Sequence, residues 1–319
     1  MPRTPRPSAP GQPSAYHRSV LPDEVVEHLQ PGPGRVFLDG TLGAGGHARG
    51  LMAKGARVIA LDVDPEAIAF ATRQLSEWSD QLTIVRGSFS KAGELLDSVG
   101  VAAIDGALLD LGVSSHQLDT PERGFSFQAD GPLDMRMDPD GPITAADLVN
   151  TMSGEQLERI FREYGEERAA RRIAVRITRE RLVRPFHTTR ELADCVESVV
   201  PRRGRIHPAT RVFQGLRLAV NRELEALEEG LQQITPLLRP GGRFAVITFH
   251  SLEDRIVKRF FKERSQEWLD RPEWPEPHRN PEFIFRAITR KAVVATRDEQ
   301  LANPRSRSAK LRVVERVTP

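Results

Sequence analysis

The chain has 319 residues, of which 39% are hydrophobic and 28% charged, and its formal net charge is +2. These values are typical of a soluble globular protein with one large domain, or with a core domain and a smaller second one. No apolar run approaches the roughly 18 residues that span a bilayer, and no apolar stretch typical of a secretory signal follows the first arginines.

The cysteines and histidines of the chain indicate whether disulfides or metal sites are expected. The single cysteine, Cys195, cannot form an internal disulfide. The histidines are scattered singly, so we expect no metal site. Together with the lack of a membrane segment, this composition predicts a cytoplasmic protein.

The first segment, residues 1–15, is dominated by Pro, Ser and Gly and is predicted to be a disordered leader. Ordered structure is expected from Tyr16. Short apolar runs at 35–39, 57–62, 82–85 and 104–109 then alternate with helical patterns. This order predicts an α/β fold with a parallel, Rossmann-like sheet and helices on both faces.

The pattern changes after about residue 140. Residues 141–207 are rich in Arg and Glu and contain only helical patterns, including a capping box at Thr188 and Glu191. A long helix over 211–238, a strand over 243–249 and a helix from Ser251 follow. We therefore predict an α/β domain formed by residues 16–140 and 208–319, with a helical insert at 141–207. The segment 264–282 gives no clear prediction.

A glycine-rich turn follows the first strand, in the sequence DGTLGAGGH at 39–47. Glycines allow a close approach of backbone to ligand, and the next helix presents free N–H groups. The stretch also fits the dinucleotide pattern Gly43-x-Gly45-x-x-Ala48, and Asp62 follows at about the spacing of a ribose-binding acid. This pattern leaves NAD, S-adenosylmethionine and a purely structural turn open. Asp62 is preferred over Asp64, which is better placed to cap its helix.

Other strand ends offer less specific candidates. Phe89 could pack on an adenine ring or belong to the core, and Asp110 could face the ligand or cap the next turn. For His47, His116 and His250, a hydrogen-bonded structural role is the simpler interpretation from each position alone.

Four blocks together resemble the ribosomal RNA small subunit methyltransferase H family, bacterial enzymes that methylate N4 of a cytosine in 16S rRNA with S-adenosylmethionine. They lie at 110–138, 164–174, 207–224 and 240–260. The resemblance implies a class I methyltransferase sheet with an inserted helical domain, and it favours S-adenosylmethionine over NAD. It also implies a set of cofactor contacts: Gly45, Gly46, His47, Asp62, Phe89, Asp110 and Gln117.

Methyl transfer from a sulfonium requires neither a metal nor a covalent nucleophile, only alignment of the reacting atoms. Asp110 is the candidate catalytic residue, either orienting the cofactor or accepting from the cytosine amino group. DNA amino-methyltransferases carry a Pro-Pro-aromatic stretch at this place, where this chain has Leu111 and Gly112. Their mechanism therefore does not transfer directly.

Clustered arginines predict that the protein binds RNA. The family resemblance implies that this RNA is 16S rRNA, alone or in the small ribosomal subunit. Guanidinium groups suit phosphate contacts, although a solvated face with pairs such as Glu167–Arg171 is an alternative. The competing functions are an NAD-dependent oxidoreductase, a nonenzymatic RNA-binding protein and a small-molecule methyltransferase. The clustered basic residues lie in three groups: Arg168, Arg171, Arg172, Arg176, Arg179, Arg181 and Arg184; Arg202, Arg203, Arg205 and Arg211; and Arg305, Arg307, Lys310 and Arg312.

Overall fold

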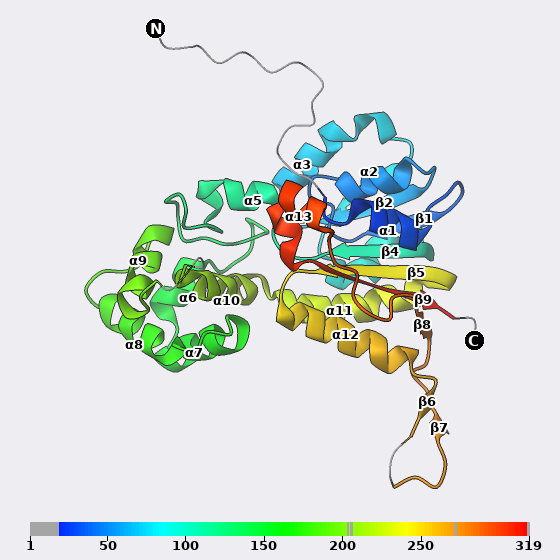
Figure 1. The fold of residues 1–319 in the computed structure, drawn as a ribbon. Coiled ribbons are helices and arrows are strands. Elements are labelled where there is room, and N and C mark those ends of the chain that lie inside the picture. Colours follow the sequence, from blue (N-terminus) through cyan, green and yellow to red (C-terminus); the bar gives the residue numbers. More distant parts are fainter. Residues whose placement is uncertain (1–18, 203, 205–206, 271–272, 318–319) are drawn as a thin grey trace.

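Seven strands form one sheet in the computed structural model, in the order β3-β2-β1-β4-β5-β9-β8 (Figure 1). The structure describes residues 19–202, 204, 207–270 and 273–317, so the predicted leader lies outside the described residues. The strands are β1 Val36–Asp39, β2 Arg57–Asp62, β3 Leu82–Arg86, β4 Ile104–Asp110, β5 Leu238–Thr248, β8 Phe285–Ala287 and β9 Lys310–Arg316.

The first five strands are parallel, which confirms the predicted α/β sheet. Strand order reverses at β1, whose two neighbours are β2 and β4. Strands β9 and β8 extend the far edge in antiparallel pairings. In open parallel sheets, ligands bind at the carboxyl ends of the strands where the order reverses, so the place to examine for a binding site is between the ends of β1 and β4.

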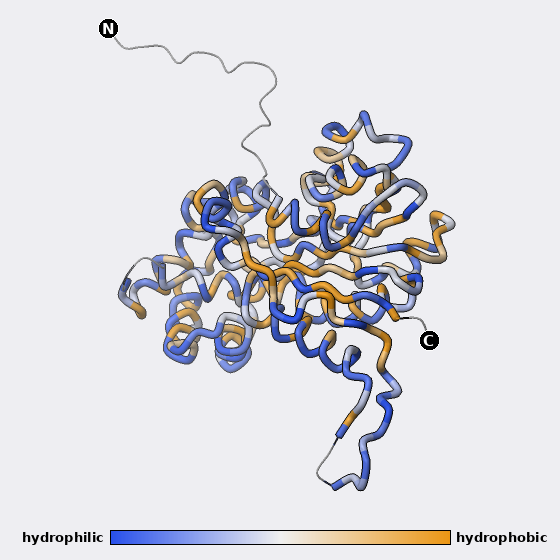
Figure 2. The backbone as a smooth tube through the Cα atoms, turned by 45° about the vertical axis from the view of Figure 1, so that its right-hand side comes forward, coloured by the Kyte–Doolittle hydropathy of each residue, from blue (hydrophilic) through white to orange (hydrophobic). Residues whose placement is uncertain are grey.

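Alternate side chains of the central strands enter two separate apolar cores. Phe37 faces a core with α1 Pro22–Leu29, α2 Gly46–Met52 and α3 Pro65–Gln74. Leu38 faces the other, with α4 Ala92–Ser98, α11 Glu223–Ile234 and α12 Ser251–Ser265. Hydrophobic segments accordingly concentrate in the sheet (Figure 2). Burial on both faces explains why these strands are continuous apolar runs.

A helical lobe leaves the sheet after β4 and lies beside it (Figure 1). Its apolar core includes residues from Phe125 to Leu216. The predicted capping box is present, because the Thr188 hydroxyl accepts from the Glu191 amide and the Glu191 carboxylate accepts from the Thr188 amide. The helices of this part of the chain are α5 Ser115–Asp119, α6 Ala145–Thr151, α7 Gly154–Arg159, the π-helical turn Ile160–Tyr164, α8 Ala170–Glu180, α9 Thr189–Val199 and α10 Ala209–Asn221.

The prediction of one long helix over 211–238 is wrong. Helix α10 ends at Asn221, and α11 begins after Arg222, which has a left-handed backbone with φ 49°. The Asn221 side chain donates to the carbonyl of Met135 at 2.8 Å and accepts from the amide of Met137 at 2.7 Å. These contacts with a distant segment fix the end of α10.

The helix predicted from Ser251 is α12, Ser251–Ser265. The residue before it, His250, caps this helix, since its side chain accepts from the Glu253 amide. Within 264–282, β6 Trp268–Leu269 and β7 His278–Arg279 pair as a small antiparallel hairpin below the sheet (Figure 1). In the described part of the chain, no helix is long and apolar enough to cross a membrane.

Candidate active site

The carboxyl ends of β1, β2 and β4 bring three acidic residues to one edge of the sheet. Asp39, Asp62 and Asp110 are the last residues of these strands. The glycine-rich turn connects β1 to α2 beside them. The structure thus brings together most of the residues predicted for the cofactor site.

The turn requires glycine for conformational and steric reasons. Gly45 precedes α2 with φ 79°, in the left-handed region that side chains rarely adopt. A Cβ atom at Gly45 would also lie 2.5 Å from a methyl of Leu75. Gly46 begins α2, and the first N–H groups of a helix have no partner within it.

Asp62 is held by backbone donors of two segments. Its Oδ2 accepts from the amide of Gly43 at 2.8 Å, and its Oδ1 accepts from the amide of Asp64 at 2.9 Å. Burial raises the pKa of Asp62, although both of these hydrogen bonds oppose the shift. An ionised carboxylate has about four lone-pair positions, so acceptor capacity remains for ligand hydroxyl groups.

Asp39, His47 and Asp110 form a largely buried cluster. His47 Nε2 lies 3.3 Å from Asp110 Oδ2, and Asp39 is only 1% exposed. Burial raises the pKa of Asp39 to about 6, against the opposing charge of His47. Burial lowers the pKa of His47, but the contact with Asp110 and the charges of both carboxylates outweigh it, so the net shift is upward.

Two carboxylate oxygens in this cluster have unused acceptor capacity. Asp39 Oδ2 and Asp110 Oδ1 are buried without a hydrogen-bond partner among the described residues. A buried polar atom left unpaired costs roughly 1–3 kcal/mol. A ligand with positive charge or N–H donors would satisfy both oxygens, so the cluster suits a cationic group.

Gln117 and Asp64 support the site from the side of α5. Gln117 Nε2 donates to Asp64 Oδ2 at 2.9 Å, and its Oε1 accepts from the amide of Ser114. Asp64 caps α3 by accepting from the Glu66 amide at 3.0 Å, which confirms the cap expected at this position. Both polar ends of the Gln117 side chain are therefore bonded within the protein.

Phe89 lies directly after β3, in a short 3-10 turn over Phe89–Lys91. Its half-buried ring packs with the core that faces α11, and a Cβ atom at Gly230 would clash with it. Packing against Gly230 explains the position of the Phe89 ring, and no contact with a ligand is needed to explain it.

A cavity of about 280 Å³ adjoins the glycine-rich turn. Gly43 and Ala44 of the turn, Ala67 and Phe70 of α3, and His116 of α5 contribute to its walls. Small, largely apolar cavities with few polar groups are typical of ligand sites, and this one lies beside the segment that holds Asp62.

Residues 14–317 match the model of the MraW methylase family. The chain belongs to this family. A ribosomal RNA small subunit methyltransferase H of Syntrophotalea carbinolica is 52% identical, over 94% of this chain and 98% of that protein. The protein of the same name from Geobacter sp. strain M21 is 51% identical, over 95% and 99%. Among solved structures, an rRNA methylase from Streptococcus thermophilus has a TM-score of 0.42 and 12% identity, over 93% of this chain and 94% of that one.

The resemblance found in the sequence is thereby confirmed. The residues 14–317 that the family model matches include the glycine-rich turn and the acid at the end of β2. Asp39 and Arg123 were missed as site residues. Asp39 could have been found as the last residue of a buried strand, whereas nothing near Arg123 in the sequence marks its contacts with Asp64 and Glu66.

The arginines of α8 leave an exposed basic surface on this MraW methylase. Arg171, Arg172 and Arg179 of α8, and Arg168 just before it, are exposed and form no ion pair within the part of the chain that the structure describes. The alternative pair Glu167–Arg171 is not formed, because Glu167 is buried and accepts from the Ala169 amide at 2.7 Å.

Other predicted RNA contacts are already engaged within the protein. Lys310 and Arg312 both pair with Asp254, at 3.0 and 2.8 Å, and Arg305 pairs with Asp119 at 2.9 Å. Arg203 and Arg205 lie outside the described residues. The clearest basic surface is therefore that of α8.

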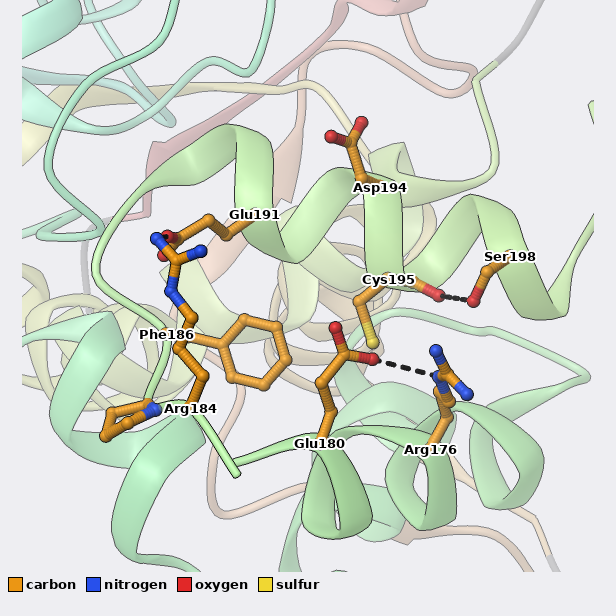
Figure 3. A pocket seen from close by; sticks show the side chains of 9 residues that line it. Arg176, Glu180, Arg184, Phe186, Glu191, Asp194, Cys195 and Ser198 are labelled. Atoms are coloured by element: carbon orange, nitrogen blue, oxygen red, sulfur yellow. Dashed lines mark hydrogen bonds and ion pairs between the residues drawn. The ribbon is translucent and has the colours of Figure 1, made fainter. Parts of the chain in front are cut away.

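A second cavity, of about 290 Å³, lies between α8 and α9 (Figure 3). Cys195 lines it, and burial, reinforced by the charge of Glu180, raises the pKa of this thiol to about 12. Such a thiol is protonated at neutral pH and therefore a poor nucleophile. Cys195 is a buried residue of the lobe core, and no cluster suited to a metal occurs among the described residues.

Proposed function

We propose that this chain is an S-adenosylmethionine-dependent methyltransferase that methylates the N4 amino group of a cytosine in 16S rRNA. The observation that carries the proposal is the pair of unpartnered buried oxygens, Asp39 Oδ2 and Asp110 Oδ1, beside the glycine-rich turn. The donor of this reaction is a cationic nucleoside, which matches an acidic cluster next to a backbone turn. The curated relatives supply the substrate class, since they are named for the small-subunit rRNA.

Each predicted residue has a proposed part in holding the donor. Asp62 grips the ribose with the acceptor capacity left beside its two backbone bonds. Gly45 and Gly46 allow the backbone to approach the donor, while His47 keeps the Asp110 carboxylate in place. The proposed parts of Gln117 and Phe89 are indirect: Gln117 holds Asp64 through a hydrogen bond, and Phe89 packs against Gly230 of α11 after the end of β3.

S-adenosylmethionine supplies an activated methyl group on sulfur. The protein contributes alignment of the cytosine nitrogen with that methyl group and an acceptor for the amino hydrogens. When the carbon–nitrogen bond forms and the carbon–sulfur bond breaks, N4 must lose a proton. Asp110 Oδ1 is the proposed acceptor, since this buried oxygen lies at the end of β4 with no partner in the described structure.

The insert at 141–207 is the proposed RNA-binding part, and residues 16–140 and 208–319 the methyltransferase domain. A target base must leave its stack to reach an enclosed site, which requires the flanking strand to be held. The unpaired arginines of α8 suit phosphate contacts. The proposed location is the cytoplasm, where the substrate is assembled.

Transfer of tritiated methyl groups to small-subunit RNA from cells that lack the enzyme tests this function. Digestion to nucleosides should place the label on N4-methylated cytidine. Naked 16S rRNA and assembled small subunits should be compared in parallel, because the charge on α8 suits either form. Label on a different nucleoside, or transfer to a small molecule alone, would contradict the proposal.

A further inference from the structure

Arg123 links two parts of the protein through one guanidinium group. Its side chain is only 11% exposed, and the residue is the last one of the short 3-10 turn Pro121–Arg123. One terminal nitrogen, Nη1, donates to Asp64 Oδ2 at 2.7 Å and to Glu66 Oε2 at 3.1 Å. The other, Nη2, donates to the carbonyls of Arg136 and Met137, each at 3.0 Å.

The first nitrogen supports the turn that carries the ribose-binding acid. Asp64 is 1% exposed, and its Oδ2 is shared by Arg123 and Gln117. Its amide donates to Asp62 Oδ1, so Arg123 is connected to Asp62 through a single residue. Without the guanidinium, a buried carboxylate would lose its charged partner, which is strongly unfavourable.

The second nitrogen holds the segment that leads into the helical lobe. Within this segment, Met135 has a left-handed backbone with φ 65°. The Asp134 carbonyl accepts from the amide of Ala145, the first residue of α6. Asn221 at the end of α10 bonds to Met135 and Met137 from the opposite side. The segment is thus bonded to α6 and to α10, two helices whose apolar residues belong to the core of the lobe.

We propose that Arg123 is a positioning residue that couples occupancy of the donor site to the placement of the RNA-binding lobe. This inference rests on the proposed function, since it takes the site at Asp62 to hold the donor and the lobe to hold RNA. The planar guanidinium can satisfy both sides at once, whereas a lysine ammonium is a single point donor. Because coupling is reciprocal, donor binding strengthens RNA binding by the same factor as RNA strengthens donor binding.

The test uses the full chain and three variants: Arg123→Met, Arg123→Lys and the control Arg239→Met. Arg239 also pairs with a carboxylate, that of Asp105 at 2.9 Å, but Asp105 lies at the amino end of β4, away from the proposed site. The affinity for S-adenosylhomocysteine is measured by calorimetry. The affinity for a small-subunit rRNA fragment is measured with and without saturating S-adenosylhomocysteine.

In the wild type, S-adenosylhomocysteine should strengthen RNA binding by about fivefold or more, within the usual range of coupling between sites. Arg123→Met should lose this strengthening and bind S-adenosylhomocysteine about tenfold more weakly. Arg123→Lys should keep more of the S-adenosylhomocysteine affinity through Asp64 yet still lose the strengthening, a separation that general destabilisation would not produce. Arg239→Met should resemble the wild type.

The inference is overturned if Arg123→Lys retains the full strengthening of RNA binding, or if the wild type shows none. Should Arg123→Met not fold, Arg123→Lys carries the test alone. A wild type that binds no S-adenosylhomocysteine would instead contradict the proposed function, so the two failures are distinguishable.

Discussion

His47 Nε2 lies 3.3 Å from Asp110 Oδ2, which leaves Asp110 Oδ1 buried and without a partner among the described residues. The imidazole nitrogen thus lies at ion-pair distance from one carboxylate oxygen, without a hydrogen bond to it among the described residues, while the other oxygen keeps its acceptor capacity. This arrangement is consistent with an acceptor for the hydrogens of an amino group. A substitution that removes the charge of Asp110 therefore tests this role.

Asp110→Asn preserves the shape of the side chain and removes that charge. We expect turnover to fall about 100-fold or more, the range attributed to a positioned proton acceptor. Methyl transfer to the rRNA under single-turnover conditions measures the effect. Wild-type turnover with unchanged donor affinity would remove Asp110 from the mechanism.

Asp62→Asn weakens the acceptor that we assign to the ribose. Hydrogen bonds to a charged group contribute roughly 1.5–3 kcal/mol, so the Kd for S-adenosylhomocysteine should rise about tenfold or more. Asp97→Asn, at an exposed position of α4, is the matched control and should bind normally. Equal affinities of the two variants would show that Asp62 does not contact the donor.

Asp39 predicts a pH dependence of stability. Its pKa is raised from 3.8 to about 6 in the folded chain, chiefly by burial. Between these values the folded state binds more protons than the unfolded state, so the free energy of unfolding falls as pH rises from about 4 to about 6 and then levels off. At 1.36 kcal/mol per pKa unit, the change is ~3 kcal/mol.

Asp39→Asn should remove this contribution. Urea unfolding of wild type and variant at several pH values gives the difference between them, in which other titrating groups cancel. The variant should gain stability relative to wild type as pH rises through this window. A constant difference between the two proteins would mean that Asp39 titrates normally.

The exposed arginines of α8 predict salt-dependent RNA binding. Replacing Arg171, Arg172 and Arg179 by Ala should lower RNA affinity and reduce the slope of log K against log salt by about 2 to 3. Arg159 and Arg162 form ion pairs with Glu163 and Glu158, so their replacement by Ala is the control. An identical salt slope in both variants would exclude the α8 surface from RNA binding.

Arg217 predicts a stability effect at the start of α11. Its guanidinium forms a largely buried two-point contact with Glu223, at 2.8 and 3.1 Å. Burial raises the pKa of Glu223, and Arg217 opposes this rise. Arg217→Met should cost ~3–5 kcal/mol, because it leaves a buried carboxylate unpaired. Adding Glu223→Leu should restore much of the loss in thermal unfolding, and no restoration would argue against the pair.

Much of the sheet could be predicted from the sequence because its central strands are buried on both faces. Val58, Ile59, Ala60 and Leu61 form a continuous apolar run for that reason. Gly45 and the acid at 62 were recognisable by type and spacing, whereas Gly46 was named through the family resemblance. Their convergence at the sheet edge then follows from parallel topology.

Features that depend on distant segments could not be predicted. The apolar pattern continues through Arg222, so nothing local marks the end of α10, which is set by bonds from Asn221 to Met135 and Met137. Likewise, the contacts of Arg123 with the carbonyls of 136 and 137 exist only once the chain has folded. Every residue has a backbone carbonyl, so the sequence does not indicate which carbonyl a distant side chain will bond to.

Calorimetric titration of the purified chain with S-adenosylmethionine, S-adenosylhomocysteine and NAD tests the central claim most directly. We predict saturable binding of both sulfur nucleosides at one site and no binding of NAD. Binding of NAD, with no heat from either sulfur nucleoside, would contradict the account.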